Sequence, residues 1–200
     1  MKNPWETLSR ETVYTGFLGH KVHIDKVIGP SGKESEYFVV ELKDDSTILA
    51  ITTDNKVVME KTWRYPTNKE SFELPVGGIE EGETPLEGGK RELKEETGYF
   101  DGEWTFLGTH FMNNGFCSAR SNIFLARNVM PGIADNSDEN EKLEVVLMEF
   151  DELKKMVMEN KIDDSRTELA VLLAEKLLVG DGELESPTPV LSGQCSNQLS

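Results

Sequence analysis

The stretch LPVGGIEEGETPLEGGKRELKEETG, at residues 74–98, decides the fold of this chain. Its second half carries the start and stop signals of a helix. Thr84 is a good N-cap, Pro85 suits the first helical position, and Glu87 stands three residues after the cap, as in a capping box. Gly98 can adopt the left-handed conformation that often ends helices. We therefore expect a helix over residues 85–97, directly after a glycine-rich turn.

Three carboxylates share one face of this predicted helix. Glu92, Glu95 and Glu96 stand at i, i+3 and i+4, which places their Cβ atoms about 5–6 Å apart. Like charges at this spacing destabilise a bare helix unless water, a cation or a divalent metal offsets them. Oxygen ligands alone favour a hard ion, Mg²⁺ with Mn²⁺ as a substitute. The alternative is a solvated helix face, since Glu and Lys are also good surface helix formers.

The spacing of the fixed residues resembles the box of the Nudix hydrolases, G-x5-E-x7-R-E-U-x-E-E-x-G-U, where U is a bulky aliphatic residue. Gly77, Glu83 and the run from Arg91 to Gly98 match its eight fixed positions, and only the final U differs, because Tyr99 stands there. From about 5 to 178 the order of elements is similar to the ADP-ribose pyrophosphatase branch of that family. The resemblance implies an α/β fold, a Nudix α/β/α sandwich with a mixed sheet, preceded by a small N-terminal antiparallel β domain.

The resemblance also implies roles for residues of the box. The implied metal ligands are Glu92 and Glu96 as principal ligands, Glu95 through metal or water, and the main-chain carbonyl of Val76. Arg91 and Glu83 are expected to be structural. Arg91 would pair inside the carboxylate cluster and so reduce its self-repulsion.

An acidic loop over residues 131–141 is the implied source of the general base. Its end, Asp138-Glu139-Asn140-Glu141, is similar to the loop that delivers a late catalytic glutamate in this branch. Glu139 would deprotonate the attacking water, with Glu141 supporting it or touching a metal, and Glu95 completes the implied catalytic set. The alternative for this loop is solvated surface charge.

Four residues are candidates for contacts with the substrate. Arg64 precedes the box, and its guanidinium fork matches phosphate oxygens; Arg120 is a second candidate of this kind. In this branch an aromatic side chain from the partner's N-terminal domain commonly stacks on the nucleobase, and Phe17 and Tyr37 lie in the corresponding region. The alternatives are surface arginines and ordinary strand residues. The branch also implies a homodimer, which suits a hairpin too small to be stable alone.

The resemblance implies metal-dependent hydrolysis of the diphosphate bond of a nucleoside diphosphate sugar. ADP-ribose is the favoured substrate, with AMP and ribose 5-phosphate as products. ADP-ribose hydrolases of this branch usually carry a proline about sixteen residues beyond the box, whereas residues 111–116 here contain none. GDP-mannose, another nucleoside diphosphate sugar and a dinucleotide therefore stay open as substrates. A second alternative is a non-catalytic Nudix-fold sensor of such a sugar, although its usual mark is a broken box.

The rest of the chain predicts strands before and after the box and two helices near the end. A hairpin is expected from Val22 and Ile24 to residues 37–42, and a second strand pair at 47–52 and 57–60. Further strands are expected at 106–108, 123–126 and 143–147, and helices at 151–160 and 165–178, the latter opened by a capping box from Ser165 to Glu168. The expected domains are residues 1–45, a catalytic unit at 46–180 and a disordered tail at 181–200.

Composition excludes several classes of protein. The chain has 21 Lys+Arg against 37 Asp+Glu, a net charge of −16, which argues against nucleic acid and anionic membranes as partners. No stretch approaches the roughly 18 apolar residues of a membrane span, and the first residues lack a signal peptide's apolar run, so we expect a cytoplasmic protein. The two cysteines, Cys117 and Cys195, indicate neither a disulfide framework nor a zinc site.

Overall fold

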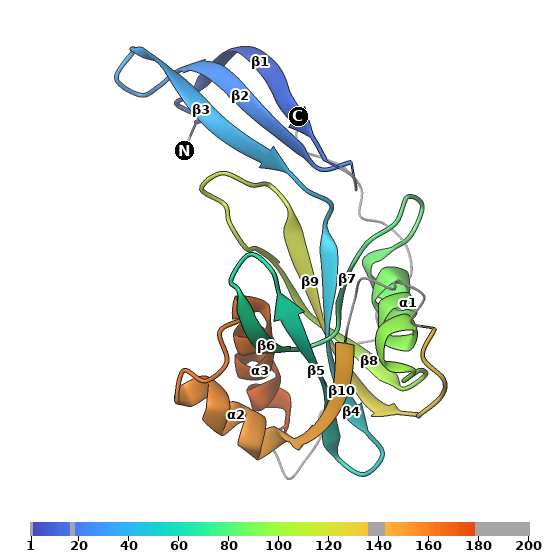
Figure 1. Cartoon of the computed structure of the whole chain (residues 1–200). Helices are drawn as coiled ribbons and strands as arrows, with labels where there is room; N and C mark the ends of the chain where they lie inside the picture. The colour runs from blue at the N-terminus through green and yellow to red at the C-terminus, as the bar shows by residue number, and fades with distance from the viewer. Residues whose placement is uncertain (1, 17–18, 136–142, 179–200) are drawn as a thin grey trace.

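The computed structural model describes residues 2–16, 19–135 and 143–178 (Figure 1). Three strands come first in the chain: β1 (Glu6–Thr15), β2 (Lys21–Ile28) and β3 (Glu34–Glu41). The remaining strands are β4 (Asp45–Thr52), β5 (Lys56–Arg64), β6 (Lys69–Glu73), β7 (Val76–Gly78), β8 (Glu103–Phe111), β9 (Arg120–Val129) and β10 (Leu143–Glu149). The helices are α1 (Pro85–Thr97), α2 (Phe150–Met158) and α3 (Ser165–Leu178).

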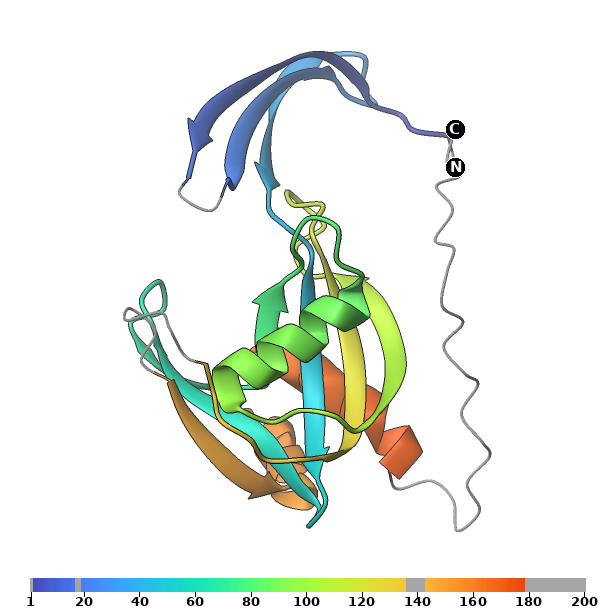
Figure 2. The ribbon, with the colours of Figure 1, turned by 90° about the vertical axis from the view of Figure 1, so that its right-hand side faces the viewer.

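The first three strands form an antiparallel sheet in the order β1-β2-β3. The predicted hairpin is therefore confirmed as β2 and β3, and β1 adds a strand that was not singled out. Every residue of β1 is exposed. The alternation of apolar and polar residues that marks a half-buried strand is therefore not required here. The sheet stands apart from the main body in both ribbon views (Figures 1 and 2).

The main body contains a seven-stranded mixed sheet. Its path is β10-β5-β4-β9-β8, with β6 added to β5 and β7 added to β4. The β4 and β9 strands run parallel, and the other pairs are antiparallel. Figure 2 shows α1 on one face of this sheet and α3 behind it. The predicted α/β/α sandwich with a mixed sheet and a small N-terminal β sheet is confirmed, whereas the division at residue 45 stays a prediction.

Strand β4 lies at the centre of the sandwich, so both of its faces are buried. Ile48 packs with Leu93 of α1 in one hydrophobic cluster, and Leu49 packs with residues of α2 and α3 in the other. Adjacent residues of a strand point to opposite faces, so one short apolar run serves both cores. The predicted pair of this strand with β5 is short, since only Ala50 and Ile51 are paired with it; β9 and β7 are its longer partners.

The boundaries of α1 agree with the prediction at both ends. The Thr84 side chain accepts a hydrogen bond from the Glu87 backbone N–H, and the Glu87 carboxylate accepts one from the Thr84 N–H. Gly98 follows the helix with φ 77° and its N–H donates to the Lys94 carbonyl. The capping box also places the first turn of α1 at a fixed point after the glycine-rich turn.

The predicted cap of α3 is wrong. Ser165 is already the first helical residue, and Asp164 supplies the cap, because its Oδ2 atom accepts from the Thr167 N–H at 2.9 Å. An aspartate serves as N-cap as well as a serine does, so the two adjacent residues compete for this role. Within the described residues, no helix has the length and apolar character needed to cross a membrane.

The N-terminal sheet contacts the body through the turn between β8 and β9. The Val40 N–H donates to the Phe116 carbonyl at 2.8 Å, and the Tyr37 hydroxyl donates to the Gly115 carbonyl at 2.8 Å. The rings of Phe38 and Phe116 also lie 6.1 Å apart. These contacts place the first strands beside the end of the main sheet at which β4 begins.

Candidate active site

Glu92 of α1 packs against the glycine pair of β7. A Cβ atom placed on Gly77 would lie 1.8 Å from Cδ and 2.1 Å from Oε1 of Glu92, far closer than real Cβ atoms approach. Any side chain at position 77 would therefore displace this carboxylate. Gly78, the next residue, has nothing within 4 Å of its Cβ position. The glycine of the box at position 77 thus makes room for a carboxylate, whereas its neighbour does not.

Arg91 connects three of the carboxylates of the box. Its Nε and Nη2 atoms donate to the two oxygens of Glu83 at 2.8 and 3.0 Å. Its Nη1 atom donates to Glu92 at 2.8 Å and to Glu95 at 3.1 Å. Nη2 also donates to the Gly78 carbonyl at 2.8 Å, which ties the helix to β7. The predicted pairing of Arg91 inside the cluster is confirmed.

Arg91 holds one carboxylate of this cluster, Glu83, in its ionised form. The hydrogen bonds from Arg91 lower the pKa of Glu83 to about 2, helped by the Glu80 backbone N–H and opposed by burial. The same contacts, led by that with Glu83, raise the pKa of Arg91. One guanidinium neutralises only part of the negative charge, so the face that carries Glu92, Glu95 and Glu96 stays suited to a cation.

The carboxylate oxygens on this face are of the kind that bind a hard divalent ion. The Glu92 side chain is 16% exposed and Glu95 45%, and one oxygen of Glu96 is buried. As the described side chains stand, no group of three or more His, Cys, Asp or Glu is arranged around a single metal position. Arg91 Nη1 lies within hydrogen-bond distance of both Glu92 and Glu95, and a cation would compete for these oxygens. The ligand set stays a prediction.

Two glycines, Gly88 and Gly89, lie inside α1, and the structure gives a reason for the first. A Cβ there would lie 3.3 Å from Oε2 of Glu83, which Arg91 holds in place. At Gly89 a Cβ would lie 3.4 Å from Cβ of Ser46, close to ordinary van der Waals contact. The Ser46 hydroxyl donates to the Pro85 carbonyl at 2.7 Å, so this part of α1 rests directly on β4.

A second charged network, which the sequence did not predict, lies next to the box. Glu73 ends β6 with only 3% of its surface exposed, and the Arg64 fork donates to both of its oxygens at 2.6–3.1 Å. Arg166 of α3 lies 3.9 Å from Glu73 and 3.5 Å from Asp45. The sequence shows an acid directly before the box, but neither its burial nor the supply of one of the two arginines by α3 can be seen in it.

The other predicted site residues have contacts of their own. Val76 pairs with Thr47 in the β4–β7 ladder, next to Gly77. The Arg120 guanidinium lies 5.2 Å from the centre of the Phe111 ring, and Tyr37 packs edge-on against Trp5. Phe17, Glu139 and Glu141 lie outside the described residues. Among the described residues, Val76 next to Gly77 and the glutamates of α1 lie together at the box.

In this α/β/α sandwich the glycine-containing strand β7 leads to helix α1, whose carboxylates are held by Arg91. This is the arrangement of a Nudix hydrolase. The family model described as "NUDIX domain" matches residues 42–169, and the chain belongs to this family. The resemblance to this family is thereby confirmed by the family model and the fold, and the resemblance to its ADP-ribose pyrophosphatase branch by the relatives.

The chain is similar to curated proteins over most of its length. It is 31% identical to a methanol dehydrogenase activator from Bacillus methanolicus over 83% of this chain and 90% of that protein. It is 28% identical to an ADP-ribose pyrophosphatase from Bacillus subtilis (strain 168), again over 83% of this chain and 90% of that protein. A solved structure titled as an ADP compounds hydrolase superposes with a TM-score of 0.77 at 24% identity. It covers 90% of this chain and 97% of that one, which shows the shared fold.

Proposed function

We propose that this chain hydrolyses the diphosphate bond of a nucleoside diphosphate sugar in a Mg²⁺-dependent reaction, with ADP-ribose as preferred substrate and AMP and ribose 5-phosphate as products. The observation that carries the proposal is the seating of Glu92 on Gly77, with Arg91 joining it to Glu83 and Glu95. Arg91 thereby holds the carboxylates of Glu92 and Glu95 in fixed positions on one face of the helix. The similarity to an ADP-ribose pyrophosphatase supports the choice of substrate.

Glu92 and Glu96 are the proposed principal metal ligands, with Glu95 and the Val76 carbonyl as further ones. A bound divalent ion screens the diphosphate and lowers the pKa of the attacking water. Arg91 keeps the carboxylates oriented, and its fixed fork does this better than a flexible ammonium. Glu139 is the proposed base that accepts the proton of the water, and Glu141 supports it.

Arg64 is the proposed contact of the chain with the diphosphate. Its guanidinium is already oriented by Glu73, while 43% of its side chain remains exposed. A pre-oriented arginine loses less freedom when it binds phosphate oxygens than a mobile one does. Arg120, whose guanidinium lies over Phe111, remains a second candidate for phosphate.

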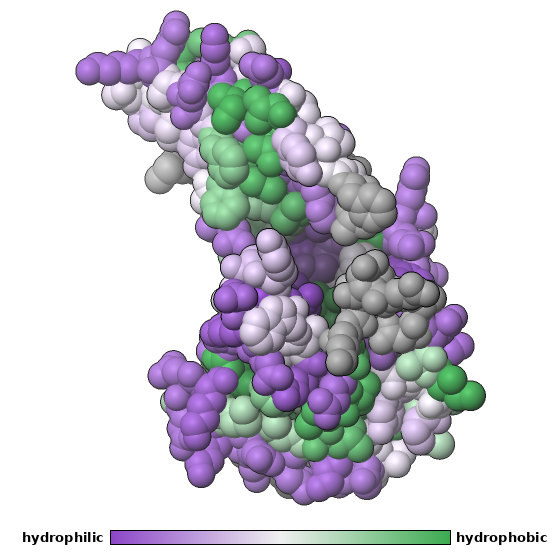
Figure 3. All heavy atoms as spheres, in the orientation of Figure 1, coloured by the Kyte–Doolittle hydropathy of each residue, from purple (hydrophilic) through white to green (hydrophobic). Residues whose placement is uncertain are grey.

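The N-terminal sheet is the proposed dimer interface and contributes Phe17 and Tyr37 to nucleobase recognition. Large apolar side chains are exposed on its strands, among them Leu8, Val13, Tyr14 and Phe38. Figure 3 shows apolar residues gathered on the visible face of this part of the molecule. A second copy of the chain would cover them, and sedimentation velocity tests this: a monomer at micromolar concentration contradicts the dimer.

The test of the proposed reaction is a substrate panel with Mg²⁺ and with EDTA. ADP-ribose, ADP-glucose, GDP-mannose, UDP-glucose, NADH and ATP are incubated with the full chain, and released phosphomonoester is measured with a coupling phosphatase. We expect ADP-ribose to be cleaved fastest and EDTA to stop the reaction. Faster cleavage of another sugar nucleotide would move the substrate to that compound. Tight binding of one of these compounds without cleavage of any of them would contradict hydrolysis and favour the non-catalytic sensor.

A second candidate function is activation of a methanol dehydrogenase. It is favoured by the 31% identity to such an activator over 83% of this chain. The test measures methanol dehydrogenase turnover with and without the chain. If activation occurs, the Glu96→Gln variant shows whether hydrolysis is needed for it, because that substitution removes a proposed metal ligand while keeping the shape of the side chain.

A further inference from the structure

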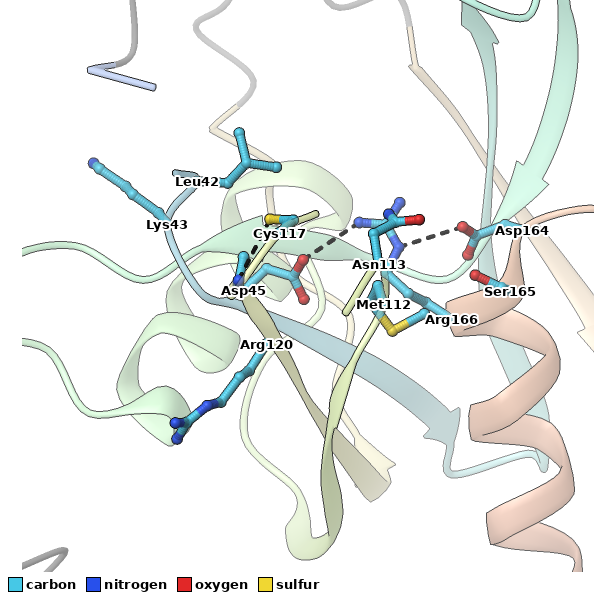
Figure 4. Close-up of a pocket in the computed structure, with 11 residues that line it drawn as sticks. Leu42, Lys43, Asp45, Met112, Asn113, Cys117, Arg120, Asp164, Ser165 and Arg166 are labelled. Atoms are coloured by element: carbon cyan, nitrogen blue, oxygen red, sulfur yellow. Dashed lines mark hydrogen bonds and ion pairs between the residues drawn. The ribbon is translucent and has the colours of Figure 1, made fainter. Parts of the chain in front are cut away.

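Arg166, in the first turn of α3, forms ion pairs with carboxylates from three parts of the chain. Its Nε atom lies 3.3 Å from Asp164, the residue directly before the helix. Its Nη1 atom lies 3.5 Å from Asp45 of β4, and its Nη2 atom lies 3.9 Å from Glu73 of β6. Figure 4 shows the guanidinium between Asp45 and Asp164. One side chain of α3 thus connects the helix to two strands of the main sheet.

The same turn of α3 also holds the main chain next to Glu73. The Leu74 N–H donates to the Thr167 hydroxyl oxygen at 3.0 Å, and both residues are fully buried. The Thr167 hydroxyl donates in turn to Asp164 at 2.8 Å, and Asp164 also accepts from the Thr167 N–H. Buried networks whose members are paired in this way rigidify a structure. Glu73 therefore has a fixed backbone position relative to α3.

Glu73 shares one of its oxygens between two arginines. Because this carboxylate is buried, protein groups must compensate its charge. Arg64 makes the close contacts, with Nη2 at 2.6 Å and Nε at 3.1 Å from Oε2, and Arg166 lies near the same oxygen. The Arg64 side chain is 43% exposed and that of Arg166 26%. Arg64 is thus the more accessible of the two to a ligand.

A phosphate that binds Arg64 competes with Glu73 for the same guanidinium. Hydrogen bonds that Arg64 gives to phosphate oxygens weaken the compensation of the buried carboxylate, and leaving a buried charge uncompensated is costly. Arg166 keeps a second positive charge beside Oε2 of Glu73 while this happens. It therefore lowers the cost of sharing Arg64 between the carboxylate and a ligand.

We propose that Arg166 is a positioning residue for the diphosphate. It acts through Glu73, which it keeps compensated and in place, so that Arg64 can present its guanidinium to the phosphate oxygens. The inference rests on the proposed function, in which Arg64 is the diphosphate contact. Arg166 needs no contact with the substrate for this role, because its three nitrogens already face carboxylates of the protein.

The first test is steady-state hydrolysis of ADP-ribose by variants of the full chain. Arg166→Met removes the charge but keeps a long side chain. We expect it to raise KM about fivefold to tenfold and to change kcat less than about twofold, as expected for a lost binding contribution. Arg166→Lys restores the charge and should recover most of the loss in KM.

The double variant separates positioning from direct contact with the substrate. If Arg166 acts through Arg64, adding Arg166→Met to Arg64→Lys should raise KM by less than a further factor of about two, because both substitutions affect one contact. The matched control is Glu175→Gln, which removes an ion pair with Lys154 near the other end of α3. Both kinetic constants of this control should stay within about twofold of the parent.

The second test needs no substrate, because it follows the Arg64 side chain itself by NMR. A guanidinium Nε–H held in a hydrogen bond exchanges slowly with water, and the Arg64 signal is assigned by its loss in Arg64→Lys. We expect this Nε–H, which donates to Glu73, to exchange about threefold faster or more in Arg166→Met. The exchange rate in Glu175→Gln should equal that of the parent.

Three results would each overturn the inference: an unchanged Nε–H exchange rate of Arg64 in Arg166→Met, an unchanged KM in that variant, or an equal rise in KM with and without Arg64→Lys. Arg166→Gln, which keeps N–H donors without the charge, takes the place of Arg166→Met if the latter fails to fold. Faster exchange in a chain that cleaves no sugar nucleotide would contradict the proposed function and leave the positioning of Arg64 by Arg166 standing. The failures of the two proposals are thus distinguishable.

Discussion

Glu92 occupies the space that a side chain at position 77 would need, since a Cβ atom on Gly77 would lie 1.8 Å from its Cδ. The φ angle of Gly77 is not in the left-handed region, so the need for glycine here is one of space. Packing between β7 and α1 therefore sets the position of a proposed metal ligand.

Gly77→Ala should move Glu92 or strain the contact between β7 and α1. We expect a loss of about 1–3 kcal/mol in the free energy of unfolding, typical of an overpacked site, together with a fall in hydrolysis. Urea denaturation and ADP-ribose cleavage measure the two effects. Gly78→Ala is the matched control, because nothing lies within 4 Å of its Cβ position. Equal behaviour of the two variants would contradict this explanation of the glycine.

Glu92→Gln and Glu96→Gln should each reduce kcat by about 100-fold or more, because a metal supplies several kcal/mol of transition-state stabilisation. Circular dichroism should show an intact fold in both. Glu81→Gln, at an exposed position of the glycine-rich turn, serves as the control and should keep its activity. Retention of most activity in either helix variant would refute the ligand assignment.

The pairing of Glu83 with Arg91 predicts a dependence of stability on pH. The pKa of Glu83 falls from 4.5 to about 2 in the folded protein, so its stabilising contribution is present above pH 4.5 and is lost as pH falls toward 2. Urea unfolding of the parent and of Glu83→Gln between pH 7 and 3 should therefore show a difference that narrows toward acid. A constant difference across this range would show that the carboxylate is not stabilised by the pair.

Arg64→Lys should raise KM for ADP-ribose about tenfold with a smaller change in kcat, because a single ammonium does not replace a guanidinium fork that Glu73 has oriented. Steady-state kinetics separate the two constants, and the free energy of unfolding shows whether the pair with Glu73 also supported the fold. An unchanged KM would leave Arg64 with a structural role alone.

The boundaries of α1 could be predicted because they depend on residues close together in the sequence. Thr84, Glu87 and Gly98 act through hydrogen bonds within a few residues, so the boundaries of α1 follow directly from them. The same reasoning predicted Ser165 as the cap of α3, whereas Asp164 has that role in the structure. Both residue types suit the position, and only the backbone geometry separates them.

Features that depend on distant segments were not predictable in this way. The network of Glu73 joins β5, β6 and α3, and the contact of Gly77 with Glu92 joins β7 to α1. The box predicted that Gly77 and Glu92 belong to one site, but the steric reason appears only when the strand and the helix are packed together. Strand β1 was also not predicted. Its side chains are all exposed, and it is held by backbone pairing with β2, which leaves no periodic pattern of apolar residues to recognise.

The most direct test of the proposed activity is release of AMP and ribose 5-phosphate from ADP-ribose by the full chain. The reaction is run with Mg²⁺ and with excess EDTA, and the products are separated and measured by chromatography. We expect cleavage with Mg²⁺ and none with EDTA, restored when Mg²⁺ is added back. Cleavage that is unaffected by EDTA, or no cleavage of ADP-ribose under either condition, would contradict metal-dependent hydrolysis of this substrate by the carboxylate face of α1.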